Sequence, residues 1–206
     1  MKQAGLAIIF DLGGVLIDWN PRYLYRKLFA GDERAMEKFL AEICTPQWNE
    51  EQDAGRPFAE AVSALVNRHP EHGDLIRAFW DRWPEMIAGA IEPAVAVMAE
   101  LKAAGYPLYA LSNWSAETFR LTRPLFAFFD WFEEIIISGE VRLIKPDPRV
   151  YGLLLEKIGR PARDCFFIDD SVTNVAAARE LGFRTILFQS PEQLRAELSR
   201  MRLLPD

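Results

Sequence analysis

Short runs of consecutive apolar residues recur along the chain, and none of them alternates polar with apolar positions. Continuous runs of this kind are typical of strands buried on both faces of a parallel sheet, although a buried helix can show the same pattern. The four clearest runs cover residues 6–10, 108–111, 166–168 and 185–188. The segments that follow these runs therefore decide between strand and helix.

Helical patterns lie between the apolar runs. Val150, Leu154 and Ile158 share one helical face, and Asp147 and Pro148 suit the N-cap and the first helical position. A second helix is predicted to begin near residue 172 and to end near 182, and a third covers about 93–104. Strands that alternate with helices predict a doubly wound, Rossmann-like α/β fold around a parallel sheet.

The strand pattern disappears between residues 18 and 92, where helical spacing replaces it. Phe58, Val62, Leu65 and Val66 lie at helical intervals and form one apolar face. We therefore expect a core built from residues 1–17 and 93–206, with residues 18–92 inserted after the first strand as a helical unit.

Composition and charge exclude several classes of protein. Half of the 206 residues are hydrophobic and 26% are charged, which is typical of a folded globular enzyme. The formal charge of −6, without long Lys or Arg runs, argues against a nucleic-acid partner. No apolar stretch is long enough to span a membrane. Cys44 and Cys165 lie far apart in the sequence, so we expect reduced thiols and a cytoplasmic location.

Polar residues follow three of the predicted strands at the point where each strand ends. Asp11 follows the first run, residues 112–113 (Ser-Asn) the second, and residues 169–170 (Asp-Asp) the third, while Lys145 lies in a Pro-containing loop. In open α/β sheets, ligands bind outside the carboxyl ends of the strands. These side chains are therefore predicted to converge on one site.

Four segments of this site resemble, in order, the four motifs of the haloacid dehalogenase superfamily. They are residues 9–15 (IFDLGGV), 111–113 (LSN), 145–146 (KP) and 167–171 (FIDDS). The resemblance runs from about residue 5 to residue 190, and the helical insertion lies where that family has its cap domain. Bacterial glucose-1-phosphate phosphatases of this superfamily have a similar Asp-Leu-Gly opening.

Physical chemistry suggests a task for each of these side chains. Asp11 suits a nucleophile, because a carboxylate needs no deprotonation near pH 7 and can form an aspartyl ester or phosphate. Lys145 would neutralise the carboxylate and the transferring oxyanion, and Ser112 would hold a non-bridging oxygen. Gly13 and Gly14 would let the backbone turn and approach an anion, although a Gly pair also suits a plain turn.

Adjacent carboxylates at a strand end need a cation or a proton between them, and oxygen ligands favour Mg²⁺. The resemblance implies that Asp11, Asp170 and the Gly13 carbonyl bind the metal, with Asp169 beside them or acting as a bridging acid. The alternative for Asp170 is that it only caps the following helix together with Ser171.

One position departs from the family pattern. Most phosphatases of this superfamily have a second Asp two residues after the nucleophile, whereas this chain has Gly13. Three hypotheses stay open: a phosphatase that acts on a good leaving group such as an anomeric oxygen or an acyl phosphate, a 2-haloacid dehalogenase, or a weakly catalytic or binding-only relative. Dehalogenases of the family need no metal and have uncharged residues where this chain has Asp169 and Asp170. The two aspartates of this chain therefore favour an Mg²⁺-dependent phosphatase for a small phosphorylated metabolite.

Substrate selection is predicted to lie in the insertion. Several aromatic and polar residues cluster near its ends, and aromatic faces with a few polar groups suit a sugar or small metabolite. The candidates for substrate contact are Asn113, Gly13, Gly14, Trp19, Trp48 and Arg56, from a cluster that also contains Arg22, Asn49, Gln52 and Asp53. Asn113 could instead fix its loop, Trp48 could be core packing, and Asp18 suits an N-cap or a hinge of the insertion.

Overall fold

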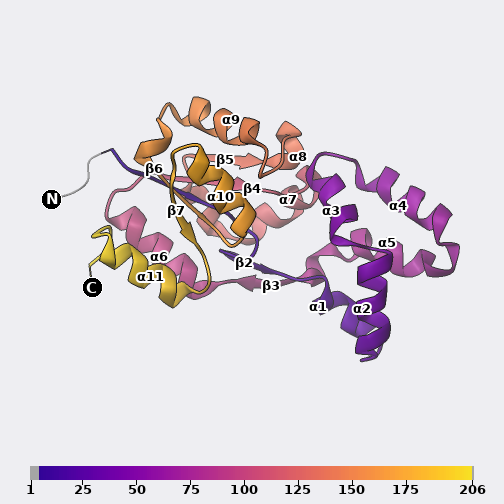
Figure 1. Cartoon of the computed structure of the whole chain (residues 1–206). Helices are drawn as coiled ribbons and strands as arrows, with labels where there is room; N and C mark the ends of the chain where they lie inside the picture. Colours follow the sequence, from indigo (N-terminus) through magenta and orange to yellow (C-terminus); the bar gives the residue numbers. More distant parts are fainter. Residues whose placement is uncertain (1–4, 206) are drawn as a thin grey trace.

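The computed structural model describes residues 5–205, which form a central sheet of five parallel strands flanked by helices (Figure 1). In spatial order the strands are β5 (Glu134–Ile137), β4 (Leu108–Ser112), β1 (Ala7–Phe10), β6 (Cys165–Asp169) and β7 (Arg184–Leu187). The first strand lies in the middle, so that Phe10 is registered with both Ala110 and Ile168. The predicted doubly wound parallel sheet is confirmed.

Helices cover both faces of the sheet, because alternate strand side chains point to opposite faces. The helices of this core are α6 (Glu92–Ala103), α7 (Ala116–Thr122), α8 (Ser138–Val141), α9 (Pro148–Ile158), α10 (Val172–Glu180) and α11 (Pro191–Arg200). Ile8 and Phe10 share an apolar cluster with residues of α6 and α11. Ala7 and Ile9 share a second cluster with residues of α9 and α10. Burial on both faces explains why the strands are continuous apolar runs.

The predicted helix starts are observed, whereas one core strand was missed. The Asp147 side chain accepts a hydrogen bond from the Arg149 amide, and Pro148 opens α9. The strand β5 was not predicted, because it begins with a charged residue and is buried only at Ile136 and Ile137. A half-buried strand at the edge of a sheet gives a weaker apolar pattern than a central one.

The inserted helices lie beside the sheet (Figure 1). They are α1 (Arg22–Leu28), α2 (Glu33–Glu42), α3 (Pro46–Asp53), α4 (Phe58–Arg68) and α5 (Gly73–Asp81). A two-stranded antiparallel ribbon of β2 (Ile17–Trp19) and β3 (Ile87–Ala90), also absent from the sequence prediction, connects them to the core. The remaining elements are the 3₁₀ helices η1 (Pro70–His72), η2 (Trp83–Met86), η3 (Arg123–Leu125), η4 (Ala127–Trp131) and η5 (Ala162–Asp164).

The ribbon lies at the predicted boundaries of the insertion. The division into residues 1–17 plus 93–206 and residues 18–92 stays a prediction. Asp18 is not a helix cap: it lies in β2 and accepts a hydrogen bond from the Tyr23 hydroxyl at 2.8 Å. Instead, the Asn20 side chain accepts from the Arg22 amide at the start of α1. The hinge interpretation of Asp18 therefore fits its position better.

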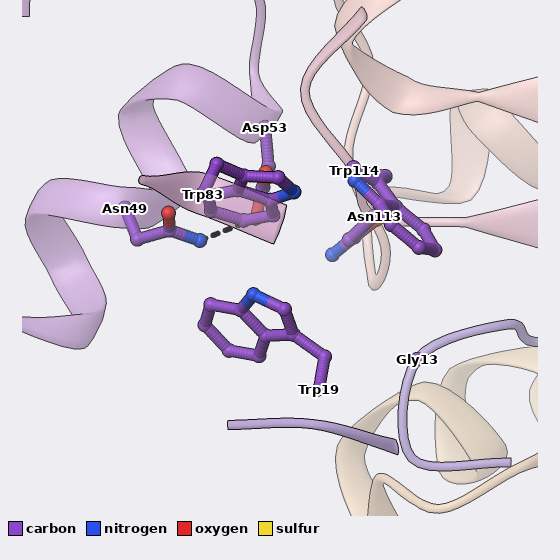
Figure 2. Close-up of a pocket in the computed structure, with 7 residues that line it drawn as sticks. All are labelled: Gly13, Trp19, Asn49, Asp53, Trp83, Asn113 and Trp114. Atoms are coloured by element: carbon purple, nitrogen blue, oxygen red, sulfur yellow. Dashed lines mark hydrogen bonds between the residues drawn. The ribbon is translucent and has the colours of Figure 1, made fainter. Parts of the chain in front are cut away.

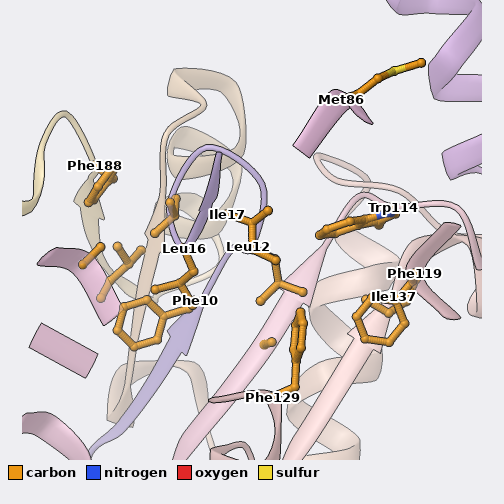
Figure 3. Packing of buried hydrophobic residues seen from close by; sticks show 14 of the residues in the cluster. Phe10, Leu12, Leu16, Ile17, Met86, Trp114, Phe119, Phe129, Ile137 and Phe188 are labelled. Atoms are coloured by element: carbon orange, nitrogen blue, oxygen red, sulfur yellow. The ribbon is translucent and has the colours of Figure 1, made fainter. Parts of the chain in front are cut away.

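Apolar packing continues from the sheet toward the inserted helices. Leu12, Leu16 and Ile17, which follow β1, are fully buried, and they belong to the same cluster as Trp114 and Met86 (Figure 3). This packing fixes the loop after β1, which carries the candidate nucleophile. Among residues 5–205, no helix combines the length and the apolar character that crossing a membrane requires.

Candidate active site

The structure brings the polar strand ends together at the carboxyl edge of the sheet. The Ser112 hydroxyl donates to Asp11 Oδ1 at 2.6 Å, and Lys145 Nζ lies 3.0 Å from Asp11 Oδ2. The same Nζ lies 2.6 Å from Asp169 Oδ2. The three strands that carry Asp11, Ser112 and Asp169 are neighbours in the sheet, and parallel pairing aligns their carboxyl ends.

Lys145 is a buried, fixed positive charge. Its ammonium group also donates to the Leu111 carbonyl at 2.9 Å, which adds a third acceptor to the two carboxylates. Burial alone would lower the pKa of Lys145, but Asp11 and Asp169 outweigh it and raise this pKa. Asn113 holds the lysine loop: its Oδ1 accepts from the Lys145 amide at 2.8 Å, and its Nδ2 donates to the Lys145 carbonyl at 2.9 Å.

Asp11 lies in a site where burial and neighbouring charges oppose each other. Burial is the largest cause that raises the pKa of Asp11, and Asp169 adds to the rise, whereas Lys145 and the Ser112 hydroxyl oppose it; the net result is a pKa of about 7. The Leu12 amide donates to Oδ1 at 2.7 Å, so both carboxylate oxygens have donors. These contacts fix the orientation of the Asp11 carboxylate at the carboxyl edge of the sheet.

The two adjacent aspartates differ in environment. Asp169 is fully buried and accepts from Lys145, from the Ser171 amide at 2.8 Å and from Asn174 Nδ2 at 3.2 Å. Asp170 is exposed, and partial desolvation followed by the charge of Asp169 raises its pKa. Because the Ser171 side chain caps α10, the capping alternative for Asp170 is not needed. Asp170 is therefore available for a ligand.

The two glycines after the nucleophile have different constraints. Gly14 has φ +73°, and a Cβ there would collide with the Asp170 carboxylate, so a side chain is excluded. Gly13 lies outside the left-handed region, and a Cβ there would meet no atom within 4 Å. The tight turn thus requires glycine at position 14, whereas position 13 is open.

The donor set fits a divalent cation. Oxygens of Asp11, Asp169 and Asp170 lie within 4.8 Å of one another, and Lys145 supplies one positive charge for three carboxylates. The excess negative charge favours a cation, and a set of oxygen donors suits a hard ion such as Mg²⁺.

A cavity of about 60 Å³ lies where the inserted helices face the loops of the core (Figure 2). Its walls are Gly13, Trp19, Asn49, Asp53, Trp83, Asn113 and Trp114. The rings of Trp19 and Trp83 stack with centroids 5.5 Å apart. Asn49 Nδ2 donates to Asp53 Oδ2 at 3.0 Å. The insertion and the core therefore both contribute to one enclosed site.

Several buried polar atoms of this cavity have no hydrogen-bond partner within residues 5–205. They are the indole nitrogens of Trp19 and Trp83, which are donors, and Asn49 Oδ1, which is an acceptor. Figure 2 shows the Trp19 nitrogen pointing toward the space enclosed by these residues. Buried polar groups are normally satisfied, so such atoms at a cavity indicate a site for a polar ligand.

Trp48 and Arg56, predicted to contact substrate, do not line this cavity. Trp48 is buried and packs edge-on against Phe79, with ring centroids 5.1 Å apart. Arg56 forms an ion pair with Glu51 and lines a separate depression that also includes Arg142 of the core. The position of Trp48 therefore agrees with the alternative of core packing, because its ring lies among the apolar side chains of the inserted helices.

The sequence prediction missed other cavity residues. Trp114 follows directly after the Ser112–Asn113 motif, which is a signal that could have identified it. Trp83 is both buried and part of the cavity wall. Asn49 and Asp53 belonged to the predicted cluster, but nothing in their spacing singled them out.

Sequence comparison identifies the family. The model of the haloacid dehalogenase-like hydrolases matches residues 6–182, which is most of the chain. The protein therefore belongs to this family of hydrolases, in agreement with the fold and with the four motifs.

Curated relatives have different activities. The sesquiterpene phosphatase astK of Aspergillus oryzae is 28% identical over 85% of this chain and 86% of its own length. The (S)-2-haloacid dehalogenase 1 of Pseudomonas sp. is 30% identical over 87% of this chain and 82% of its own. Drimenol cyclase drtB of Aspergillus calidoustus is 27% identical, but the chain spans only 36% of that longer protein.

Among solved structures, a HAD family enzyme from Bacteroides thetaiotaomicron, in complex with magnesium and inorganic phosphate, superposes with a TM-score of 0.64. It is 25% identical over 90% of this chain and 94% of its own.

Proposed function

We propose that this hydrolase is an Mg²⁺-dependent phosphatase that acts on a small phosphorylated metabolite through an aspartyl phosphate on Asp11. The observation that carries the proposal is the arrangement of Asp11 between Ser112 and Lys145, next to the carboxylates of Asp169 and Asp170. The similarity to a phosphatase and to a structure with bound magnesium and phosphate supports it.

The side chains divide the reaction between them. A carboxylate oxygen of Asp11 attacks phosphorus, the bond to the leaving oxygen breaks, and water then hydrolyses the aspartyl phosphate. Lys145 neutralises charge on the nucleophile and on the phosphoryl oxygens, and Ser112 holds a non-bridging oxygen. Mg²⁺, held by Asp11, Asp170 and the Gly13 carbonyl with Asp169 beside them, would neutralise phosphoryl charge.

The cavity restricts the substrate. The cavity is small, about 60 Å³, and the unpaired indole and amide atoms that line it suit a small leaving group with several hydroxyl groups, such as a sugar. Trp19 would pack on this group, and the second Nδ2 hydrogen of Asn113 would donate to the substrate while the side chain holds the Lys145 loop. Gly13 and Gly14 would let the backbone approach the phosphate.

A second candidate activity is 2-haloacid dehalogenation. It is favoured by the 30% identity to a dehalogenase and by Gly13, because halide departs without needing a proton. The carboxylates of Asp169 and Asp170 disfavour it, since without a cation they would repel a haloacid. A binding-only protein is the third alternative.

One experiment separates these activities. Hydrolysis of 4-nitrophenyl phosphate and chloride release from 2-chloropropionate should each be measured with Mg²⁺ and with EDTA. We expect phosphate release that EDTA abolishes, and no chloride. Metal-independent chloride release would instead assign a dehalogenase. If the protein turns over neither substrate and none of a broad panel of phosphorylated metabolites, the binding-only alternative would be favoured.

We also propose a cytoplasmic location. The support is that Cys44 and Cys165 are both buried free thiols, as expected in a reducing compartment.

A further inference from the structure

The cavity beside the candidate nucleophile contains an ionisable side chain for which the proposed mechanism has no task. Asp53 is the last residue of α3 and shares the cavity wall with Gly13 and Asn113 (Figure 2). Its carboxylate accepts from Asn49 Nδ2 at 3.0 Å and from the backbone amide of Ser115. These donors come from the insertion and from the core, so they hold the carboxyl group where the two meet.

The surroundings of Asp53 favour a protonated carboxyl group near neutral pH. The pKa of Asp53 is raised to about 7, mainly by burial, with smaller contributions from the charges of Glu50 and Asp11, while the hydrogen bond from the Ser115 amide opposes the rise. A carboxyl group that titrates near the working pH can both give and take a proton. Asp53 lines the same cavity as Gly13, which lies two residues after Asp11 in the chain.

The rest of the cavity has no comparable group. Gly13 presents no side chain, and Asp53 is the one carboxylic acid among the lining residues. Asp169 is fully buried and already accepts from Lys145, Ser171 and Asn174. A leaving group that occupies the cavity would therefore meet Asp53 rather than another acid.

We propose that Asp53 is the catalytic acid and base of this enzyme, supplied by inserted helix α3 in place of a carboxylate at position 13. The inference rests on the phosphatase function proposed above. It explains how a site with glycine at position 13 could still protonate a leaving alcohol.

The proton transfers balance over the two steps. In the first, an Asp11 oxygen bonds to phosphorus while the bond from phosphorus to the leaving oxygen breaks. The electron pair of that bond stays on the leaving oxygen, which takes the proton of the Asp53 carboxyl group and departs as an alcohol. In the second step, water gives a proton to the Asp53 carboxylate as its oxygen bonds to phosphorus. The bond between phosphorus and the Asp11 oxygen breaks in the same step, which frees the Asp11 carboxylate and inorganic phosphate. Asp53 is then protonated again.

The test is the dependence of the rate on the leaving group. The kcat/KM of the wild type and of Asp53→Asn should be measured with 4-nitrophenyl, phenyl and ethyl phosphate in Mg²⁺. A general acid typically contributes about 10²–10⁴-fold, most for leaving groups of high pKa. We expect the wild type to show a shallow dependence, and Asp53→Asn to lose at least ~100-fold with ethyl phosphate but little with 4-nitrophenyl phosphate.

A matched control and a rescue variant separate acid catalysis from a structural role. Glu50→Gln removes an exposed carboxylate from the same helix and should leave the dependence on the leaving group shallow. Gly13→Asp places a carboxylate where a Cβ meets no atom within 4 Å. Added to Asp53→Asn, it should recover most of the loss with ethyl phosphate.

Each outcome decides between the hypotheses. Equal loss with all three esters would show that Asp53 only positions the insertion, and would overturn the inference. A steep dependence in the wild type, flattened by Gly13→Asp alone, would overturn it too, even if Asp53→Asn did not fold. A wild type that hydrolyses no phosphate ester would refute the proposed function itself. An active wild type with an unaffected Asp53→Asn variant would refute only the role of Asp53.

Discussion

Replacing Asp11 with Asn should abolish turnover and, at alkaline pH, stabilise the metal-free protein. Asp11 is almost fully buried, and its pKa is raised from 3.8 to about 7. The folded protein therefore keeps a proton on this group up to about pH 7, whereas the unfolded chain releases it near pH 4. Stability consequently falls as the pH rises through this window, by about 1.4 kcal/mol per pH unit.

The magnitude follows from this shift and from the hydrogen bonds that asparagine would lose. Ionising Asp11 in the folded state costs about 4 kcal/mol above pH 7 (1.36 times the difference between 7 and 3.8). Asparagine removes that cost, but its amide NH₂ would face a donor, either Lys145 or the Leu12 amide. Such a mismatch costs about 1–3 kcal/mol. The net gain should be about 1–3 kcal/mol at pH 8 and close to zero at pH 5.

The assay is urea denaturation followed by circular dichroism at pH 5, 6, 7 and 8, in EDTA. The wild type should lose stability between pH 5 and pH 7 more steeply than Asp11→Asn, and the difference should level off above pH 7. A constant difference in stability between the two proteins at all four pH values would refute the burial argument.

Beryllofluoride with Mg²⁺ should protect the wild type from denaturation but not the variant. Residual turnover equal to the wild type would exclude a covalent role for Asp11.

Three further predictions, two of them with a control variant, test the surrounding contacts. Lys145→Met leaves two buried carboxylates without their cation, so it should cost about 3–5 kcal/mol in the free energy of unfolding, measured by urea denaturation at pH 7, and should abolish turnover. Gly14→Ala should displace Asp170, because the added Cβ meets that carboxylate at a residue with a positive φ, and should therefore weaken Mg²⁺ binding measured by calorimetry. The control variant Gly13→Ala adds a Cβ in open space and should change the free energy of unfolding by less than about 1 kcal/mol. Trp83→Phe keeps the packing but removes an unpaired cavity donor, so it should raise KM for a sugar phosphate severalfold with little change in kcat, whereas Trp80→Phe, outside the cavity, should leave KM unchanged.

The chemistry at the strand ends could be predicted from sequence, because it follows from local patterns and one topological rule. Buried parallel strands are recognisable as apolar runs, and the residues after them must meet at the carboxyl edge of the sheet. Asp11, Ser112, Lys145 and Asp169 were therefore predicted to converge before any distance was known. The weak edge strand β5 and the ribbon of β2 and β3 escaped, because short, partly exposed strands have no distinctive period.

Which residues of the insertion reach the site depends on tertiary packing. Trp48 and Asp53 lie five residues apart at the two ends of one short helix, and the sequence places both in the same cluster. Trp48 packs against the aromatic core of the insertion, while Asp53 faces the cavity because Ser115, far away in the chain, donates to it. The need for glycine at position 14 likewise depends on a distant residue, because the Asp170 carboxylate lies where a Cβ of residue 14 would be. Such choices depend on how two separately folded segments pack against each other, which no local pattern encodes.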